Sequence, residues 1–307
     1  METTRHTFCR ICESLCGLEV TLENGKVKHI RPDSQHVATR GFACPKGLFQ
    51  HELFDSPDRL ISPRHRDENG WHDVSWDQAL TGIGASVRKI VEASGPDAIA
   101  MYVGTAAGFG VLHPVFAQGF MTGVGSRNMY ASATQDCANK FAVAERMYGF
   151  PFTLPFPDVA RTRCLIIVGA NPMVSKWSFL QVPNPRREIN DIKARGGRVI
   201  VVDPRRTETA KAAGEHIFIR PGTDVSFYLS FLHELIEQGG VDDTLIAGHT
   251  RGFDAIAALA RAFPASRTAP ITGISVDALK DLVRTYLAAD GAALYCSTGV
   301  NMSAQGT

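Results

Sequence analysis

The sequence CRICESLC at residues 9–16, followed by ACPKG at residues 43–47, decides how the first part of the chain must fold. The two segments carry four cysteines with the spacing C-x2-C-x3-C-x27-C, namely Cys9, Cys12, Cys16 and Cys44. Disulfides between cysteines this close in sequence would be strained. We therefore interpret the four thiols as ligands that converge on a soft metal centre.

The spacing of these cysteines favours a [4Fe–4S] cluster over zinc. A zinc site usually pairs its cysteines in two short hooks, whereas here three cysteines share one hook and Cys44 stands alone. Pro45 follows this last cysteine and fixes the direction in which the chain leaves the site. Structural zinc stays open as the alternative metal that the four thiols could bind.

A small β-hairpin is predicted directly after the hook. Apolar and polar residues alternate on both sides of a turn at Asn24 and Gly25. A hairpin of this size is not stable alone, so we expect the cluster to supply part of the folding energy. Residues 1–57 are therefore predicted to form an iron–sulfur domain.

The rest of the chain, residues 58–307, alternates between predicted helices and strands. One helix is expected to start after Ser75, a plausible cap, because apolar residues then recur at helical spacing. Further helices are predicted at residues 111–120, 185–194, 224–237 and 276–287, and strands at residues 98–103, 164–168, 198–202, 217–219 and 294–297. This alternation predicts an α/β fold with a mostly parallel sheet covered by helices on both faces.

Composition narrows the class of protein. The 307 residues have a formal net charge of +1 and 44% hydrophobic residues, so neither nucleic acid nor an anionic membrane is expected as a partner. Of the seven cysteines, Cys137, Cys164 and Cys296 lie far apart, which argues against a disulfide framework. No signal peptide and no apolar run of membrane-spanning length is recognisable, and we expect a cytoplasmic protein.

Residues suited to ligand binding follow three of the predicted strands. Ligands of parallel sheets bind beyond the carboxyl ends of the strands, where small residues let phosphates approach backbone amides and polar side chains hold sugars or bases. The candidates are Gly169, Asn171 and Ser175 after the first of these strands, Asp203, Arg205 and Thr207 after the second, and Gly222 and Asp224 after the third. Each also has a structural interpretation, such as a turn or a helix cap. The usual dinucleotide and P-loop motifs do not occur in the sequence.

The order of the motifs resembles the dimethyl sulfoxide reductase family of molybdopterin oxidoreductases, which includes formate dehydrogenases and nitrate reductases. The motifs are the cysteine pattern, VSWDQAL at residues 74–80, GANP at 169–172, VDPRRT at 202–207 and PGTD at 221–224. The resemblance implies a bis(molybdopterin guanine dinucleotide) cofactor with molybdenum or tungsten beside the [4Fe–4S] cluster.

The resemblance also implies roles for individual residues. Lys46 matches the basic residue between cluster and pterin, although by itself it would be taken for a surface lysine. Gly169, Asn171 and Ser175, after the strand at residues 164–168, match contacts to the phosphates. Asp203, Arg205, Thr207 and Asp224 match contacts to the guanosine, with Gly222 in the turn before the last of them.

The protein ligand of the metal is implied to lie in residues 132–140. Counting back from Gly149, which follows the helix in relatives, puts Asp136 in the ligand position. Cys137 is one residue away and is the softer ligand, so it ranks second. The structural alternatives are a helix cap for Asp136 and a small buried residue for Cys137.

Family catalytic chains run much longer and end in a domain that covers the second pterin. We therefore expect this chain to correspond to an N-terminal portion, truncated before that C-terminal cap domain. The expected function is oxidoreduction of a small molecule, with electrons passing between the molybdenum or tungsten centre, the cluster and a redox partner protein. The alternatives are a non-catalytic electron-transfer or binding remnant, or non-redox chemistry like that of a hydratase in the family. The substrate is not readable from the sequence.

Overall fold

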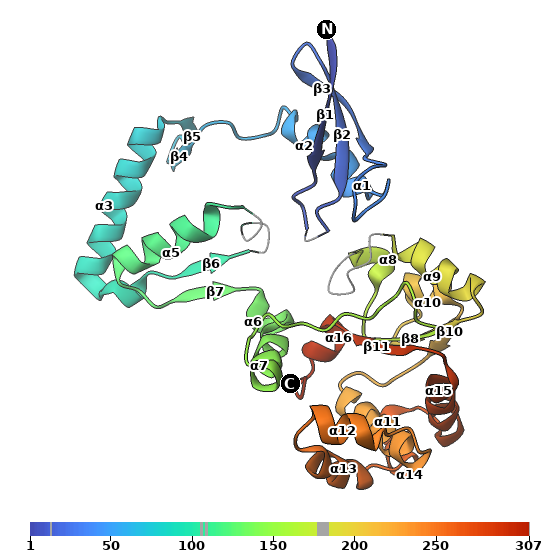
Figure 1. Ribbon diagram of the computed structural model, residues 1–307. Helices are drawn as coiled ribbons and strands as arrows, with labels where there is room; N and C mark the ends of the chain where they lie inside the picture. The colour runs from blue at the N-terminus through green and yellow to red at the C-terminus, as the bar shows by residue number, and fades with distance from the viewer. Residues whose placement is uncertain (13, 105–106, 108–109, 177–183, 307) are drawn as a thin grey trace. The chain divides into compact units, whose positions relative to one another are not determined.

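The computed structural model describes residues 1–12, 14–104, 107, 110–176 and 184–306 (Figure 1). The chain forms two compact units, Met1–Thr134 and Gln135–Thr307. The predicted iron–sulfur domain at residues 1–57 lies within the first unit, and its boundary stays a prediction.

The first unit begins with a three-stranded antiparallel sheet in the order β1-β2-β3, formed by β1 (Glu2–Phe8), β2 (Gly17–Glu23) and β3 (Lys26–Pro32). The predicted hairpin is confirmed as β2 and β3, with Asn24 and Gly25 both at positive φ in the turn. Strand β1 was not predicted. Leu18 is fully buried on one face of this sheet, where it packs with Cys9 and Cys16.

The remainder of the first unit contains short elements and two long helices. They are α1 (Pro45–Leu48), α2 (Gln50–Phe54), β4 (Arg64–Asp67), β5 (Gly70–Asp73), α3 (Trp76–Ser94), the 3-10 helix Pro96–Ala98, β6 (Met101–Val103), α5 (His113–Val124) and β7 (Met129–Ala131). Strands β4 and β5 pair antiparallel, and β6 and β7 pair parallel.

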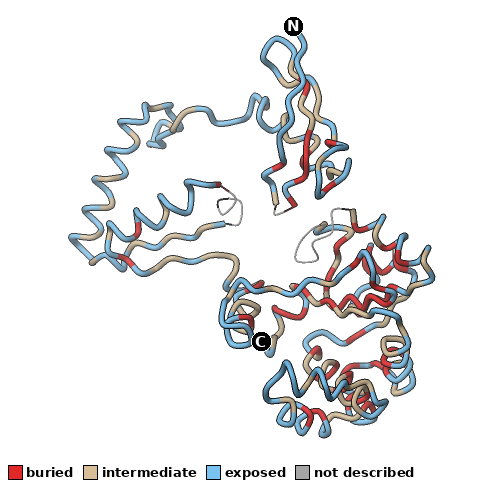
Figure 2. The backbone as a smooth tube through the Cα atoms, viewed as in Figure 1, coloured by how far each residue is buried: buried red, intermediate tan, exposed pale blue. Residues whose placement is uncertain are grey.

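Helix α3 starts where the sequence predicts. The Gln78 amide N–H donates to Ser75 Oγ at 3.2 Å, and the Ser75 amide N–H donates to Gln78 Oε1 at 2.9 Å, which completes a capping box. Most of the helix is nevertheless exposed (Figure 2). Leu80 and Ile83 of its apolar stripe are 61% and 56% exposed. Its amphipathic pattern therefore predicts the helix correctly, although nothing in the described part of the first unit buries it.

The strand predicted at residues 98–103 is shorter than expected and is not buried. Residues Pro96–Ala98 form a 3-10 helix, and only Met101–Val103 pair with another strand. Tyr102, at the centre of that strand, is 67% exposed. The apolar run predicts a core strand, but β6 belongs to a two-stranded sheet with little cover in the described residues.

The second unit is built on a four-stranded parallel sheet in the order β10-β9-β8-β11. Its strands are β8 (Cys164–Val168), β9 (Arg198–Val202), β10 (Glu215–Ile217) and β11 (Ala292–Cys296). The strand predicted at 217–219 is displaced by two residues, because residues 215–217 pair with β9 and Ile219 turns into the core. The final strand begins two residues earlier than predicted and ends one residue earlier.

The helices of this unit include the predicted α9, α11 and α15. Their bounds and those of the other helices are α6 (Ala133–Asp136, which begins at the end of the first unit), α7 (Ala138–Tyr148), α8 (Pro172–Ser175), α9 (Pro185–Ala194), α10 (Glu208–Ala213), α11 (Asp224–Glu237), α12 (Asp243–His249), α13 (Phe253–Arg261), α14 (Ala265–Thr272), α15 (Val276–Ala288) and α16 (Thr298–Asn301).

Alternate residues of β8 pack against helices on opposite faces of the sheet, as the sequence predicts (Figure 1). Ile166 contributes to a core with α11, α14 and α15, and Ile167 contributes to a second core with α9 and α10. All five residues of β8 are buried. Burying one such aliphatic side chain contributes about 1.5–3 kcal/mol, so this strand is a major source of stability for the unit.

The described residues include no helix with both the length and the apolar character needed to cross a membrane.

Gly169 ends β8 at a point where two backbone segments touch. Its φ is +58°, and a Cβ there would lie 3.0 Å from the Val300 amide nitrogen and 3.1 Å from Gly299 Cα. The Gly299 N–H donates to the Gly169 carbonyl at 2.9 Å. Glycine is required here both by the backbone conformation and by the close approach.

We predict that Gly169→Ala lowers the free energy of unfolding by about 1–3 kcal/mol, since it adds strain and a backbone clash. The matched control is Gly196→Ala, because Gly196 has φ +81° and open space around its Cβ position. Urea unfolding followed by circular dichroism measures both variants. Equal losses would show that the contact with Gly299 adds nothing to the conformational strain.

Candidate functional site

The cysteine hook is closed by its own backbone. The Cys9 N–H donates to the Cys16 carbonyl at 2.8 Å, and the Leu15 N–H donates to the Cys12 carbonyl at 3.3 Å. Leu15 adopts a φ of 45°, which is unusual for a residue with a side chain. The loop is therefore held in a tight curl by local hydrogen bonds.

The fourth cysteine reaches the hook through a helix. Cys44 occupies the N-cap position of α1, with Pro45 in the first turn. On this helix Gly47 is buried, and a Cβ there would lie 3.2 Å from Cys9 Sγ. Helix α1 thus packs directly on the hook, and only a residue without a side chain fits at the contact.

Cys9 and Cys16 each sense the other thiols of the pattern. Burial, followed by the neighbouring thiols Cys12, Cys9 and Cys44, raises the pKa of Cys16 to about 11. Burial also raises the pKa of Cys9, with Cys12 and Cys44 adding to the rise. These cysteines therefore hold protons that a metal centre would displace on binding.

The sulfurs of the four cysteines are not drawn tightly around one point. Four thiolates on one zinc ion would lie about 3.8 Å apart, given Zn–S bonds of about 2.3 Å. Among the residues that the structure describes, no three of the four cysteines have sulfurs within 4.8 Å of one another.

Lys46 lies next to this site. The side chain belongs to an exposed residue of α1, and its positive charge lowers the pKa of Cys9, opposite to the effect of burial. A cation at this position stabilises negative charge on the thiolates and on anything bound between them.

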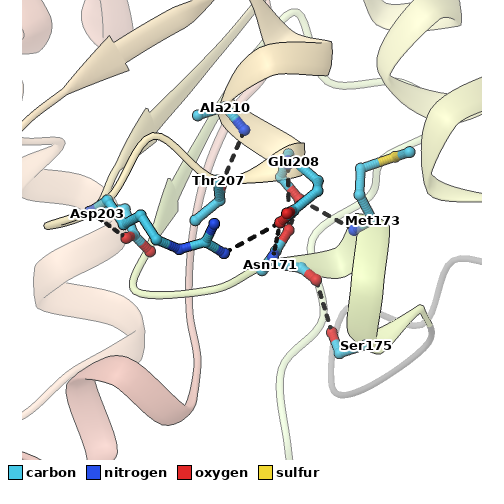
Figure 3. A network of polar contacts seen from close by, with 9 residues as sticks. Asn171, Met173, Ser175, Asp203, Thr207, Glu208 and Ala210 are labelled. Atoms are coloured by element: carbon cyan, nitrogen blue, oxygen red, sulfur yellow. Dashed lines mark hydrogen bonds and ion pairs between the residues drawn. The ribbon is translucent and has the colours of Figure 1, made fainter.

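A polar network joins the loops at the carboxyl ends of β8 and β9 (Figure 3). Asn171 Oδ1 accepts from Thr209 Oγ1 at 2.7 Å and from the Thr209 N–H at 3.2 Å, and Asn171 Nδ2 donates to Glu208 Oε2 at 2.7 Å. Ser175 Oγ donates to the Asn171 carbonyl at 3.2 Å. The side chain of Asn171 thus ties the loop after β8 to α10, a structural role that sequence reasoning did not assign.

The loop after β9 is braced in the same way. Asp203 Oδ1 accepts from the Arg205 N–H at 2.8 Å, and the Arg205 guanidinium donates to Glu208 Oε2 at 3.1 Å. Thr207 is buried and caps α10 by accepting from the Ala210 N–H at 3.1 Å. The structure therefore brings Asp203, Arg205 and Thr207 together with the loop after β8.

Asp224 lies close enough to this network for the charge of Asp203 to affect its pKa. It is buried in the first turn of α11, and burial raises its pKa, with the Asp203 carboxylate adding to the rise. Gly222 precedes it in a turn with φ +74°. The residues predicted at the three strand ends are thus assembled at one edge of the sheet, as expected for a ligand-binding edge.

The candidate metal ligands lie between α6 and α7. Asp136 is the last residue of α6, and its Oδ1 is buried without a hydrogen-bond partner in the described part of the chain. Cys137 is buried and occupies the N-cap position of α7, so Asp136 is not the cap of that helix. A buried carboxylate oxygen without a partner is costly unless something such as a metal ion binds it.

Residues from the last part of the chain hold this segment in place. Asn301 Nδ2 donates to the Asp136 carbonyl at 2.9 Å, Asn139 Nδ2 donates to the Asn301 carbonyl at 2.9 Å, and Lys140 Nζ donates to the Cys296 carbonyl at 3.0 Å. Burial lowers the pKa of Lys140, against the opposing effect of Cys296, Cys137 and Asp136. Sequence reasoning missed Lys140 and Asn301, because these contacts join residues more than 150 positions apart.

One cavity of about 600 Å³ lies in the second unit. Its lining includes Lys140, Tyr228 and Cys296 and is otherwise mainly apolar. The ligand candidates that follow β8, β9 and β10 do not line this cavity. Burial raises the pKa of Tyr228 well above its usual range, so this phenol stays protonated at neutral pH.

Comparison with known proteins adds two family matches. Residues 59–300 match the family described as molybdopterin oxidoreductase, and residues 2–56 match its Fe4S4 domain. The alpha subunit of F420-dependent formate dehydrogenase 2 from Methanococcus maripaludis is 26% identical over 96% of this chain and 42% of its own length. The assimilatory nitrate reductase of Haloferax mediterranei is 29% identical over 98% of this chain and 41% of its own.

A solved structure shares the fold. Acetylene hydratase from Pelobacter acetylenicus superposes with a TM-score of 0.79 and 23% identity, covering 98% of this chain and 41% of that one. The chain thus spans less than half the length of the curated relatives that it matches. At this level of identity the structural likeness concerns the fold alone.

The contribution of Glu208 to stability should depend on pH, because its carboxylate pairs with Arg205. The Arg205 guanidinium, followed by the Asn171 side chain, lowers the pKa of Glu208 from 4.5 to about 2. A carboxyl whose pKa is depressed on folding contributes stability above its unfolded pKa and loses it as the pH falls through the folded pKa.

We therefore expect Glu208→Gln to be less stable than the wild type above pH 4.5, with the difference disappearing as the pH falls towards 2. Urea unfolding between these pH values measures the difference. Glu237→Gln, at the exposed end of α11, serves as the control and should track the wild type throughout. A difference that stays constant with pH would contradict an ionic role for Glu208.

Proposed function

The chain belongs to the molybdopterin oxidoreductase family, and on this basis we propose that it is the N-terminal part of an enzyme that moves electrons between a bis(molybdopterin guanine dinucleotide) centre and a [4Fe–4S] cluster. The family implies both cofactors, with molybdenum or tungsten as the metal. A small-molecule substrate and a redox partner protein complete the proposal.

The convergence of the four cysteines carries this proposal most directly. Residues 2–56 match the Fe4S4 domain of the family, and Cys9 and Cys16 lie in a buried site braced by backbone hydrogen bonds. Lys46 adds a positive charge beside Cys9, where it would stabilise a reduced cluster and donate hydrogen bonds to a neighbouring pterin. We propose that electrons cross the domain past this lysine.

Asp136 is our preferred protein ligand for the metal, with Cys137 second. The bound metal would supply two-electron chemistry on the substrate, often an oxygen-atom transfer. The orphaned carboxylate oxygen of Asp136 supports its ranking. Lys140 would place a positive charge near this site, and Asn301 would hold the backbone of Asp136 in position.

We propose that the edge of the parallel sheet binds a guanine dinucleotide. Gly169 and Ser175 would face the phosphates, while Asp203 would accept hydrogen bonds from the guanine edge or ribose diol. Asn171 and Thr207 would contribute mainly by holding their loops, because their side chains already bond within the protein. The remaining candidates Arg205, Gly222 and Asp224 line the same edge.

The cluster assignment predicts the outcome of removing one ligand. Anaerobically purified chain should contain about four iron and four sulfide, and Cys12→Ser should lose most of both, because three thiolates hold a cubane poorly. Cys296→Ser is the matched control, since this thiol lies in the other unit and should leave the iron content unchanged. Iron and sulfide analysis checks both, and stoichiometric zinc without iron would overturn the assignment.

The metal-ligand assignment predicts different results for two adjacent residues. Asp136→Ala should abolish bound molybdenum or tungsten, whereas Cys137→Ala should retain it, since Asp136 Oδ1 is buried without a hydrogen-bond partner in the described residues. Elemental analysis reports the metal, and GMP released by acid hydrolysis reports the dinucleotide. The opposite pattern would make Cys137 the ligand. Cofactor-free protein in every case would favour an iron–sulfur remnant over the proposed enzyme.

A further inference from the structure

Three side chains that the proposed function does not use come together on the N-terminal sheet. They are His6 on β1, Glu19 on β2 and Asp33, which follows β3. One ligand atom from each lies within 4.8 Å of the others, the only such group in the described residues. Each side chain comes from a different strand or from the residue directly beyond it.

The strand register explains why these residues meet. His6 stands directly opposite Glu19 in the antiparallel pair of β1 and β2, so both side chains lie on the same face of the sheet. Asp33 is held beside them because its N–H donates to the Gly17 carbonyl at 2.9 Å. The apolar residues Leu18 and Ile30 pack with the cysteines, so the three ligands belong to the more polar side of β2.

The charge of the group favours a cation. Asp33 Oδ1 accepts from the Gln35 N–H at 2.8 Å, and Asp33 Oδ2 lies 3.1 Å from His6 Nδ1. The Gln35 N–H and the His6 ring thus surround this carboxyl with groups that suit its ionised form. A second carboxylate, Glu19, within the same small space adds like charge, which a bound cation would relieve.

The donor set and its spacing match a divalent first-row transition ion. One imidazole nitrogen and two carboxylate oxygens are ligands that Zn²⁺, Fe²⁺ and Mn²⁺ all accept. Two such ligands with bonds of about 2.0–2.1 Å at a tetrahedral angle lie about 3.3 Å apart, close to the His6–Asp33 separation of 3.1 Å. We propose that His6, Glu19 and Asp33 bind such an ion, with its remaining positions filled by water.

The ion would connect the strands of a domain that has little core of its own. Every residue of β1 is exposed, and the buried residues of the domain's apolar cluster are Cys9, Cys16 and Leu18. Small domains depend on such additional links, because burial of their few apolar residues does not offset the entropy lost on folding. The ion therefore acts as a structural link between β1, β2 and the segment after β3.

The test uses the full chain with its iron–sulfur cluster assembled, titrated with Mn²⁺ and followed by EPR. Mn²⁺ prefers oxygen and nitrogen donors to thiolates, so it reports this site and not the cysteines. We expect one bound ion per chain, and a rise in melting temperature that depends on the Mn²⁺ concentration. Chain that binds no Mn²⁺ above the level of the variants below would overturn the proposal.

Two variants make the test specific. His6→Ala and the nearly isosteric Glu19→Gln should each weaken binding by about tenfold or more, since losing a ligand costs no less than losing an outer hydrogen-bond partner. The control is His72→Ala, which removes a similar His–Asp pair, His72 Nε2 to Asp67 Oδ1 at 3.0 Å, that is not part of a three-ligand group. Unchanged iron content shows that each variant is folded. Equal binding by all four proteins would mean that the His6–Asp33 contact is an ordinary ion pair.

Discussion

The burial of β8 on both faces is the constraint on which the second unit depends. Five consecutive apolar residues cannot face water on either side, so helices must cover the sheet above and below. Parallel strands then require crossovers, which bring the loops after β8, β9 and β10 to one edge. The position of the proposed nucleotide site follows from this arrangement of the core and not from any one polar residue.

The edge itself is braced before any ligand binds. Asn171 bonds to both Thr209 and Glu208, and Arg205 in the loop after β9 bonds to Glu208. Preorganised loops lose less conformational entropy when a ligand arrives, and this lowers the cost of binding. Several residues that a sequence motif assigns to a cofactor thus contribute by supporting the loops that carry backbone amides.

Local signals in the sequence predicted the elements that depend on local chemistry. The Asn24 and Gly25 turn, the Ser75 cap and the branched strands β8 and β9 are where the sequence places them. The pattern did not reveal β1, whose residues stay exposed and lack a strong alternation, and the burial expected for β6 was wrong. Whether such strands form and are buried depends on strand register and on packing against distant residues. A short stretch of sequence reveals neither. The same holds for the site, where the cysteine spacing was readable but the meeting of His6, Glu19 and Asp33 depends on how three strands align.

The hydrogen bonds that link Asp136 and Lys140 to Asn301 and Cys296 tie the end of α6 and helix α7 to the last part of the chain. They join the carbonyl of Asp136 and the side chain of Lys140 to residues that also lie against β8 through Gly299. Segments joined in this way tend to unfold together as one cooperative group, so amide exchange in α7 should be coupled to exchange in α16. The conformation of the backbone around Asp136 therefore depends on α16 staying in place. It would be lost in any partly open state that releases α16.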